Sequence, residues 1–158
     1  QGTCVKELLE DVDDIHSIVS PVSGGGLLSG SLLAAKNMDS AIRVYGAEPE
    51  EADDAYRSLK LGKIVPNKTI NTICDGLRAQ IGTKTFPVIQ SLVDDIIPVS
   101  EEDIINALRM IWERLKIIVE PSCSIVLAMI INNKDLFKGQ NVGLIMSGGN
   151  IDLKKLPW

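Results

Sequence analysis

A run of three glycines is the feature of this sequence best suited to binding chemistry. The run Ser23-Gly24-Gly25-Gly26-Leu27 lies between the apolar stretch Ser17–Val22 and Leu27–Lys36, whose composition is typical of a helix. Glycines at such a junction leave backbone N–H groups uncovered, and these groups can converge on one anion at the first turn of the helix. The run therefore favours a phosphate site, and the competing interpretation is a tight turn that binds nothing.

The spacing of the glycines limits which phosphate they can hold. The pattern G-x-x-x-x-G-K-[ST] is absent, and the next glycine after Gly26 is Gly30, so G-x-G-x-x-G also fails. A nucleotide site of the Walker type is thereby disfavoured. A Rossmann-like dinucleotide site stays open as the alternative, because Glu48 follows the run by about 20 residues, where such domains place a ribose-binding acid.

A second candidate is the acidic segment that begins at Glu48. Five carboxylates fall within the seven residues Glu48-Pro49-Glu50-Glu51-Ala52-Asp53-Asp54. Carboxylate and carbonyl oxygens are the ligands of Mg²⁺, Ca²⁺ and Mn²⁺. Acidic residues also stabilise the first turn of a helix through its dipole. Spacing alone favours the helix interpretation over the metal site.

The elements that must position these groups follow from hydropathy and turn signals. Four apolar stretches predict strands, namely Ser17–Val22, Arg43–Glu48, Ile96–Val99 and Val142–Met146. With the helix Leu27–Lys36, the first two form a βαβ unit with parallel strands, which predicts an α/β fold. The last strand leads into the polar turn Ser147–Asn150. Ligands of open α/β sheets bind at the carboxyl ends of such strands.

A further helix is predicted to begin after Ser100, whose hydroxyl can cap its first turn. Apolar residues recur along it at helical spacing, at Ile104, Ile105, Leu108, Ile111, Trp112 and Leu115. Charged residues fall largely on other faces, at Glu102, Arg109, Glu113, Arg114 and Lys116. One face of this helix is therefore expected to be buried and the other to contact water.

Composition predicts one domain over residues 1–158, since 45% of the residues are hydrophobic and can form one core. The net charge of −5 and the lack of a basic cluster argue against nucleic acid as a partner. No apolar stretch reaches the ~18 residues of a membrane span. Cys4, Cys74 and Cys123 fit neither a disulfide framework nor a zinc site, which favours a reducing, cytoplasmic setting.

Taken together, six motifs resemble the serine racemase and threonine (serine) dehydratase family, which consists of fold-type II enzymes dependent on pyridoxal 5′-phosphate (PLP). They are Ser23-Gly24-Gly25-Gly26-Leu27, Glu48–Asp54, Asp75-Gly76, Trp112-Glu113-Arg114, Val119-Glu120-Pro121-Ser122 and Met146–Asp152. The resemblance covers the whole chain and matches the C-terminal half of the family. It implies a mostly parallel sheet flanked by helices, the large-domain part of the tryptophan-synthase-β-like fold.

The resemblance also implies a function. It implies PLP-dependent racemisation of serine, or loss of water from L-serine or L-threonine to give a ketoacid and ammonia, in a homodimer. Two departures leave the reaction open: Ser23 replaces a glycine common in racemases, and Ser122-Cys123-Ser124 replaces smaller residues. We expect Cys123 to be a buried, inert thiol.

Roles for individual residues follow from the same resemblance. The backbone of Ser23, Gly24, Gly25, Gly26 and Leu27 would hold the PLP phosphate, Gly76 and Glu120 would line the cofactor site, and Ser147 would hydrogen-bond the pyridine nitrogen. A serine hydroxyl cannot stabilise a fully protonated ring as a carboxylate does, which suits proton loss at Cα and β-elimination. Glu48, the carbonyl of Ala52 and Asp54 would bind Mg²⁺, Ca²⁺ or Mn²⁺. Arg114, Lys116 and Asn150 would contribute to an activating ATP site.

The sequence lacks one catalytic group that the family has. In this family a lysine of the N-terminal half forms the Schiff base with the cofactor, within a Ser-Phe-Lys-like stretch, and no lysine here has that neighbourhood. The chain is therefore predicted to be a fragment of the catalytic large domain that is inactive alone, with no catalytic residue of its own. The alternative is a catalytically silent PLP- or nucleotide-binding module.

Overall fold

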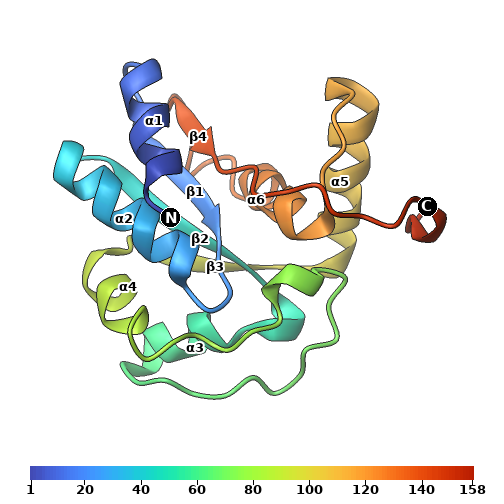
Figure 1. Cartoon of the computed structure of the whole chain (residues 1–158), viewed down its shortest axis with the longest axis horizontal. Helices are drawn as coiled ribbons and strands as arrows, with labels where there is room; N and C mark the ends of the chain where they lie inside the picture. Colours follow the sequence, from blue (N-terminus) through green and yellow to red (C-terminus); the bar gives the residue numbers. More distant parts are fainter.

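Four parallel strands form the centre of the structure, a computed structural model that describes residues 1–158 (Figure 1). They are β1 (Ser17–Pro21), β2 (Arg43–Pro49), β3 (Asp95–Val99) and β4 (Val142–Leu144), in the order β3-β2-β1-β4. Ser17 of β1 is paired with Arg43 of β2 on one side and with Val142 of β4 on the other. The predicted α/β fold class and parallel βαβ unit are confirmed.

Helices cover both faces of the sheet, because successive residues of a strand point to opposite faces and both faces here are apolar. Ile18 packs with residues of α1 (Thr3–Asp11), α2 (Gly26–Met38), α3 (Asp54–Leu61) and α4 (Phe86–Leu92). Its neighbour Val19 packs with α5 (Glu101–Leu115) and α6 (Pro121–Asn132). Short 3-10 turns occur at Glu50–Ala52, Asp75–Leu77 and Leu153–Lys155. The fold is thus a three-layer α/β/α sandwich.

Helix α5 matches its prediction except at its end. The Ser100 hydroxyl accepts a hydrogen bond from the Asp103 N–H at 3.2 Å, and Ile104, Leu108 and Ile111 are buried. Leu115, predicted to be buried, is 57% exposed. It is the last helical residue, and Lys116 turns the chain away with a φ of 59°.

The carboxyl ends of β1 and β4 are neighbours, which determines where a ligand can bind. β4 is shorter than predicted because the chain leaves the sheet after the Ile145 N–H has bonded to the Val19 carbonyl at 3.0 Å. Since β1 and β4 are adjacent and parallel, the glycine run after β1 and the turn after β4 emerge at one edge of the sheet. No helix is both long and apolar enough to cross a membrane.

Candidate functional site

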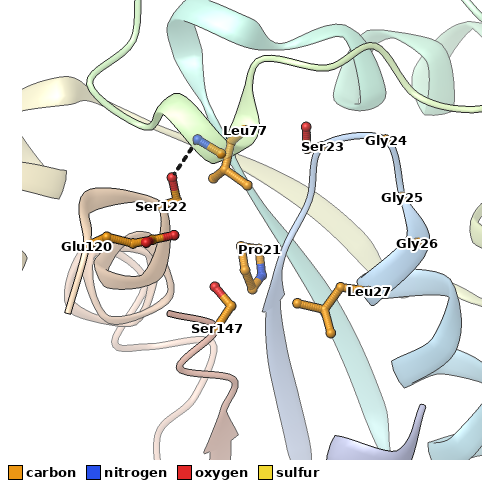
Figure 2. Close-up of a pocket in the computed structure, with 11 residues that line it drawn as sticks. Pro21, Ser23, Gly24, Gly25, Gly26, Leu27, Leu77, Glu120, Ser122 and Ser147 are labelled. Carbon is orange, nitrogen blue, oxygen red and sulfur yellow. Dashed lines mark hydrogen bonds between the residues drawn. The ribbon is translucent and has the colours of Figure 1, made fainter. Parts of the chain in front are cut away.

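One cavity of about 210 Å³ lies beyond the carboxyl ends of β1 and β4 (Figure 2). All eight residues that the family resemblance assigned to the cofactor line it, namely Ser23, Gly24, Gly25, Gly26, Leu27, Gly76, Glu120 and Ser147. Pro21, Leu77 and Ser122 complete the lining. The structure therefore brings together residues from four separate parts of the chain.

The glycine run forms one wall of the cavity, and its backbone donors are free. The N–H groups of Ser23, Gly24 and Gly25 donate no hydrogen bond within the protein. Gly26 begins α2, whose first turn adds further unpaired N–H groups and the positive end of the helix dipole. Such an array can bind a phosphate without any cationic side chain.

Gly25 has a conformation that other residues rarely adopt. Its φ is 86°, in the left-handed region. A Cβ atom there would lie 2.7 Å from the Thr85 hydroxyl oxygen and 2.7 Å from Cδ1 of Ile81. This position therefore needs glycine both for its backbone angle and for the closeness of its neighbours.

Ser23 takes part in the site through its backbone, since its side chain is occupied elsewhere. The hydroxyl accepts a hydrogen bond from the Ala79 N–H at 3.1 Å and lies 3.2 Å from the Ala79 carbonyl oxygen. The side chain thus joins the glycine run to the segment that follows Gly76.

The opposite wall is built by the start of α6. The Ser122 hydroxyl accepts a hydrogen bond from the Gly76 N–H at 3.0 Å, the dashed line in Figure 2. The Glu120 carboxylate accepts one from the Asn150 N–H at 2.7 Å, and the Glu120 N–H donates to the Gly148 carbonyl at 3.1 Å. Glu120 is therefore fastened to the turn that follows β4 and is half-buried, not a freely solvated carboxylate.

Ser147 lies on that turn, at the carboxyl end of β4. Its side chain points into the cavity in Figure 2, on the β4 side and away from the glycine run. The hydroxyl has no hydrogen-bond partner in the protein, so it is free to donate to a ligand. The cavity thus offers unpaired N–H donors at one end and one neutral hydroxyl at the other.

Two of the five carboxylates in the acidic segment are buried, in contrast to a solvated helix start. Glu48 and Asp54 are each 1% exposed. The Glu48 carboxylate accepts hydrogen bonds from the N–H groups of Ala55 at 2.9 Å and Tyr56 at 2.7 Å, which caps α3. Burial raises the pKa of Glu48 to about 8. Glu48 does not line the cavity at the glycine run, so it cannot bind the ribose of a dinucleotide held there, and the Rossmann-like alternative is wrong.

Asp54 has the feature expected of a cation ligand. One carboxylate oxygen accepts a hydrogen bond from the Ile81 N–H at 2.7 Å, and the other is buried without a partner. Burial raises the pKa of this carboxyl as well. Ala52, whose carbonyl was assigned to the same site, is also buried. No three His, Cys, Asp or Glu side chains converge, so a cation here would need carbonyl or water ligands too.

The residues assigned to ATP are not gathered in one cavity. Arg114 and Lys116 are exposed at the carboxyl end of α5. Asn150 lines a separate cavity of about 350 Å³ with Arg78, and neither Arg114 nor Lys116 lines it.

The burial predicted for Cys123 is confirmed. Cys123 is fully buried beside the cavity, 3.4 Å from the sulfur of Met146, and burial raises the pKa of its thiol. Cys74 is also buried, with its pKa raised by burial to about 12. All three cysteines are free, and a buried thiol with a raised pKa is unreactive.

Comparison with known proteins identifies the family of this chain. Residues 1–148 match the family model described as pyridoxal-phosphate dependent enzyme. The chain belongs to this family. It is 44% identical over 158 residues to the β-hydroxyaspartate dehydratase of Paracoccus denitrificans, covering 100% of the chain and 50% of that protein. It is 48% identical to the serine racemase of Arabidopsis thaliana, covering 99% of the chain and 49% of that protein.

Solved structures of this PLP-dependent family have the same fold. The serine racemase of Dictyostelium discoideum superposes with a TM-score of 0.90 at 47% identity, over 96% of this chain and 49% of that one. The threonine deaminase isoform 2 of Solanum lycopersicum gives 0.93 at 30% identity, over 98% of this chain and 46% of that one. The fold is the predicted fold type II of the PLP enzymes, and the chain spans about half the length of the relatives it matches.

Three lining residues were not predicted as part of the site. Pro21 ends the strand that precedes the glycine run, Leu77 follows Gly76, and Ser122 follows Glu120 by two positions. Their nearness in sequence to predicted residues was the available signal. Only the folded structure shows that Ser122 bonds to Gly76 in the wall of the cavity.

Proposed function

We propose that this chain is the cofactor-binding part of a PLP-dependent enzyme that acts on β-hydroxy-α-amino acids. The proposal rests on one observation. The same cavity has free glycine N–H groups at one end and the free Ser147 hydroxyl at the other. Relatives of the chain are named for serine, threonine and 3-hydroxyaspartate, which all carry a hydroxyl on Cβ. The reaction is racemisation of serine, or loss of water from L-serine or L-threonine to give a ketoacid and ammonia.

Each wall of the cavity has its own task in this function. The N–H groups of Ser23, Gly24 and Gly25, with the first turn of α2, bind the phosphate group. The Ser147 hydroxyl donates a hydrogen bond to the ring nitrogen and leaves the ring without a full positive charge. Glu120 and Gly76 close the wall between them. When bound, PLP supplies an electron-withdrawing ring that stabilises negative charge at the substrate Cα.

The group that removes the Cα proton is expected from a different part of the protein. No lysine is among the residues that line the cavity. We infer that the chain corresponds to the C-terminal part of the catalytic large domain. On its own it then binds PLP and does not turn over substrate, so the silent-module interpretation describes the isolated chain.

The test is a titration of the purified chain with PLP, followed by borohydride reduction and intact mass measurement. We expect saturable PLP binding, an unchanged mass near 17.1 kDa at low PLP, and no ketoacid from L-serine or L-threonine. The full-length enzyme should release ketoacid and acquire one reduced PLP adduct outside this chain. A chain that binds no PLP would contradict the proposal.

We further propose that Glu48, Asp54 and the carbonyl of Ala52 bind a divalent cation. The unpartnered, buried oxygen of Asp54 supports this site. At a concentration about ten times its Kd, Mg²⁺, Ca²⁺ or Mn²⁺ should stabilise the fold by about 1.4 kcal/mol. That stabilisation raises the melting temperature by roughly 4 °C.

Thermal melts with and without EDTA measure this effect, and two neighbouring variants test its site. Asp54→Asn keeps an acceptor for the Ile81 N–H and removes the charge, so the rise with cation should vanish. Asp53→Asn is the matched control, because Asp53 is engaged with Arg57 at 2.7 Å and lies outside the proposed ligand set. An equal rise in both variants would place the cation elsewhere.

The remaining assignments rest on the family resemblance. We propose that an activating ATP contacts Arg114, Lys116 and Asn150 in the full-length enzyme. We also propose that this enzyme is a homodimer. A cytoplasmic setting is supported by three cysteines that are all free in the structure.

A further inference from the structure

The glycine run is held from the side opposite the cavity by the segment 79–85. The Gly24 carbonyl accepts two hydrogen bonds from this segment, one from the Gly82 N–H at 3.1 Å and one from the Thr85 hydroxyl at 2.7 Å. Neither Gly82 nor Thr85 lines the cavity. The Gly24 carbonyl is therefore directed toward the 79–85 segment.

The direction of this carbonyl determines the direction of the next N–H group. A trans peptide is planar, so its C=O and N–H point to opposite sides, and the chain has no cis peptide. With the Gly24 carbonyl bonded to Thr85, the Gly25 N–H points away from Thr85. It has no acceptor within the protein, and Gly25 lines the cavity. The orientation of this one peptide thus decides whether the cavity presents a donor or a carbonyl oxygen to a phosphate.

Nothing in the glycine run itself would keep this orientation. Neither Gly24 nor Gly25 has a Cβ, so the peptide between them can rotate with little steric resistance. A rotated peptide would present the Gly24 carbonyl to the cavity and repel an anion. The two donors on the far side must therefore hold the peptide.

The Thr85 hydroxyl bonds to the Gly24 carbonyl and does not make the contact that is usual for its position at the start of a helix. It is the N-cap residue of α4, where a threonine hydroxyl commonly accepts a hydrogen bond from the first turn of its helix. Here the side chain caps nothing, and its hydroxyl lies closer to the Gly24 carbonyl, at 2.7 Å, than to the Gly82 carbonyl, at 3.1 Å.

We propose that Thr85 is a positioning residue that holds the Gly24–Gly25 peptide in the orientation that binds the phosphate of PLP. The proposal rests on the function proposed above and names a residue outside the cavity lining. Thr85 does not contact the ligand. It acts by fixing the orientation of the Gly24 carbonyl. The Gly25 N–H, which belongs to the same peptide, is the group that contacts the phosphate.

The experiment compares the affinities of the purified chain for PLP and for pyridoxal, which lacks the phosphate, by equilibrium titration. Thr85→Ala should weaken PLP binding by about tenfold, the effect of one hydrogen bond that orients a donor to a charged group. Pyridoxal binding should not change. Thr85→Ser keeps the hydroxyl and should restore the wild-type affinity for PLP.

The control is Thr83→Ala, an exposed threonine of the same segment whose side chain makes no hydrogen bond, and it should bind both ligands as the wild type does. If Thr85→Ala weakens PLP and pyridoxal equally, or leaves PLP unaffected, the positioning role is wrong while the proposed function stands. If Thr85→Ala does not fold, equal PLP affinities of Thr85→Ser and Thr85→Val overturn the proposal. A wild-type chain that binds no PLP overturns both.

Discussion

Alanine in place of Gly25 is expected to cause the largest loss of stability and of PLP binding of any single substitution in the glycine run. The left-handed backbone costs an alanine about 1–2 kcal/mol. The added Cβ would lie 2.7 Å from the Thr85 hydroxyl oxygen, 2.7 Å from Cδ1 of Ile81 and 2.8 Å from Cδ1 of Ile89. Forcing these groups apart adds about 1–3 kcal/mol. The total, about 3 kcal/mol, lowers the melting temperature by roughly 10 °C.

Gly26 provides the control for this prediction. A Cβ atom at Gly26 would have no atom within 4 Å, and its φ is not positive. Since Gly26 is the first residue of α2, Gly26→Ala should leave the free energy of unfolding within about 0.5 kcal/mol of the wild type. Urea denaturation of both variants measures the difference in their free energies of unfolding. PLP titration shows whether the affinity for PLP changes in parallel with stability. Equal stabilities would mean that Gly25 does not have the left-handed conformation.

The second large effect is expected at Ser147, and it concerns the proposed chemistry and not the fold. Ser147→Asp replaces a neutral donor with a carboxylate, which would favour protonation of the ring nitrogen that we propose residue 147 contacts. A carboxylate at residue 147 would make a bound ring withdraw electrons more strongly, which would change the balance between the proposed racemisation and loss of water. We expect the full-length enzyme to lose at least about 100-fold in kcat, as when one preorganised group of an active site is lost.

Nitrogen NMR of ring-labelled PLP bound to the purified chain measures the protonation directly, without turnover. The ring-nitrogen signal should move to the protonated position in Ser147→Asp and stay at the wild-type position in Ser147→Thr, which keeps a hydroxyl. The same signal in wild type and Ser147→Asp would show that residue 147 does not contact the ring nitrogen.

The sheet and the cavity lining were accessible to sequence reasoning for different reasons. The four strands are short apolar runs, and both faces of the sheet are covered, so hydropathy alone identifies them. The glycine run and Ser147 each follow such a strand, and parallel neighbouring strands bring their carboxyl ends together. Gly76 and Glu120 lack this relation to a strand. Only the family resemblance assigned them to the site.

The segment between α3 and α4 could not be placed from its sequence. It is largely irregular, so it has no hydrophobic period that reports which surface it covers. Its path is fixed by single hydrogen bonds to distant residues, such as Ile81 to Asp54 and Ala79 to Ser23. Glu48 illustrates the same limit. Its position in the sequence suits a ribose ligand, and only the folded structure shows that its side chain is directed to the start of α3 and does not line the cavity.

The spread of the cavity lining along the chain determines when the site is completed during synthesis. Its walls come from residues 21–27, 76–77, 120–122 and 147, which are spread over nearly the whole chain. A nascent polypeptide therefore has no complete binding site until Ser147 has left the ribosome, however early β1 and α2 form. If the cavity binds PLP as we propose, the cofactor would be captured only after residues 21–147 have emerged and folded together, so cofactor uptake would report on the folding of this whole region.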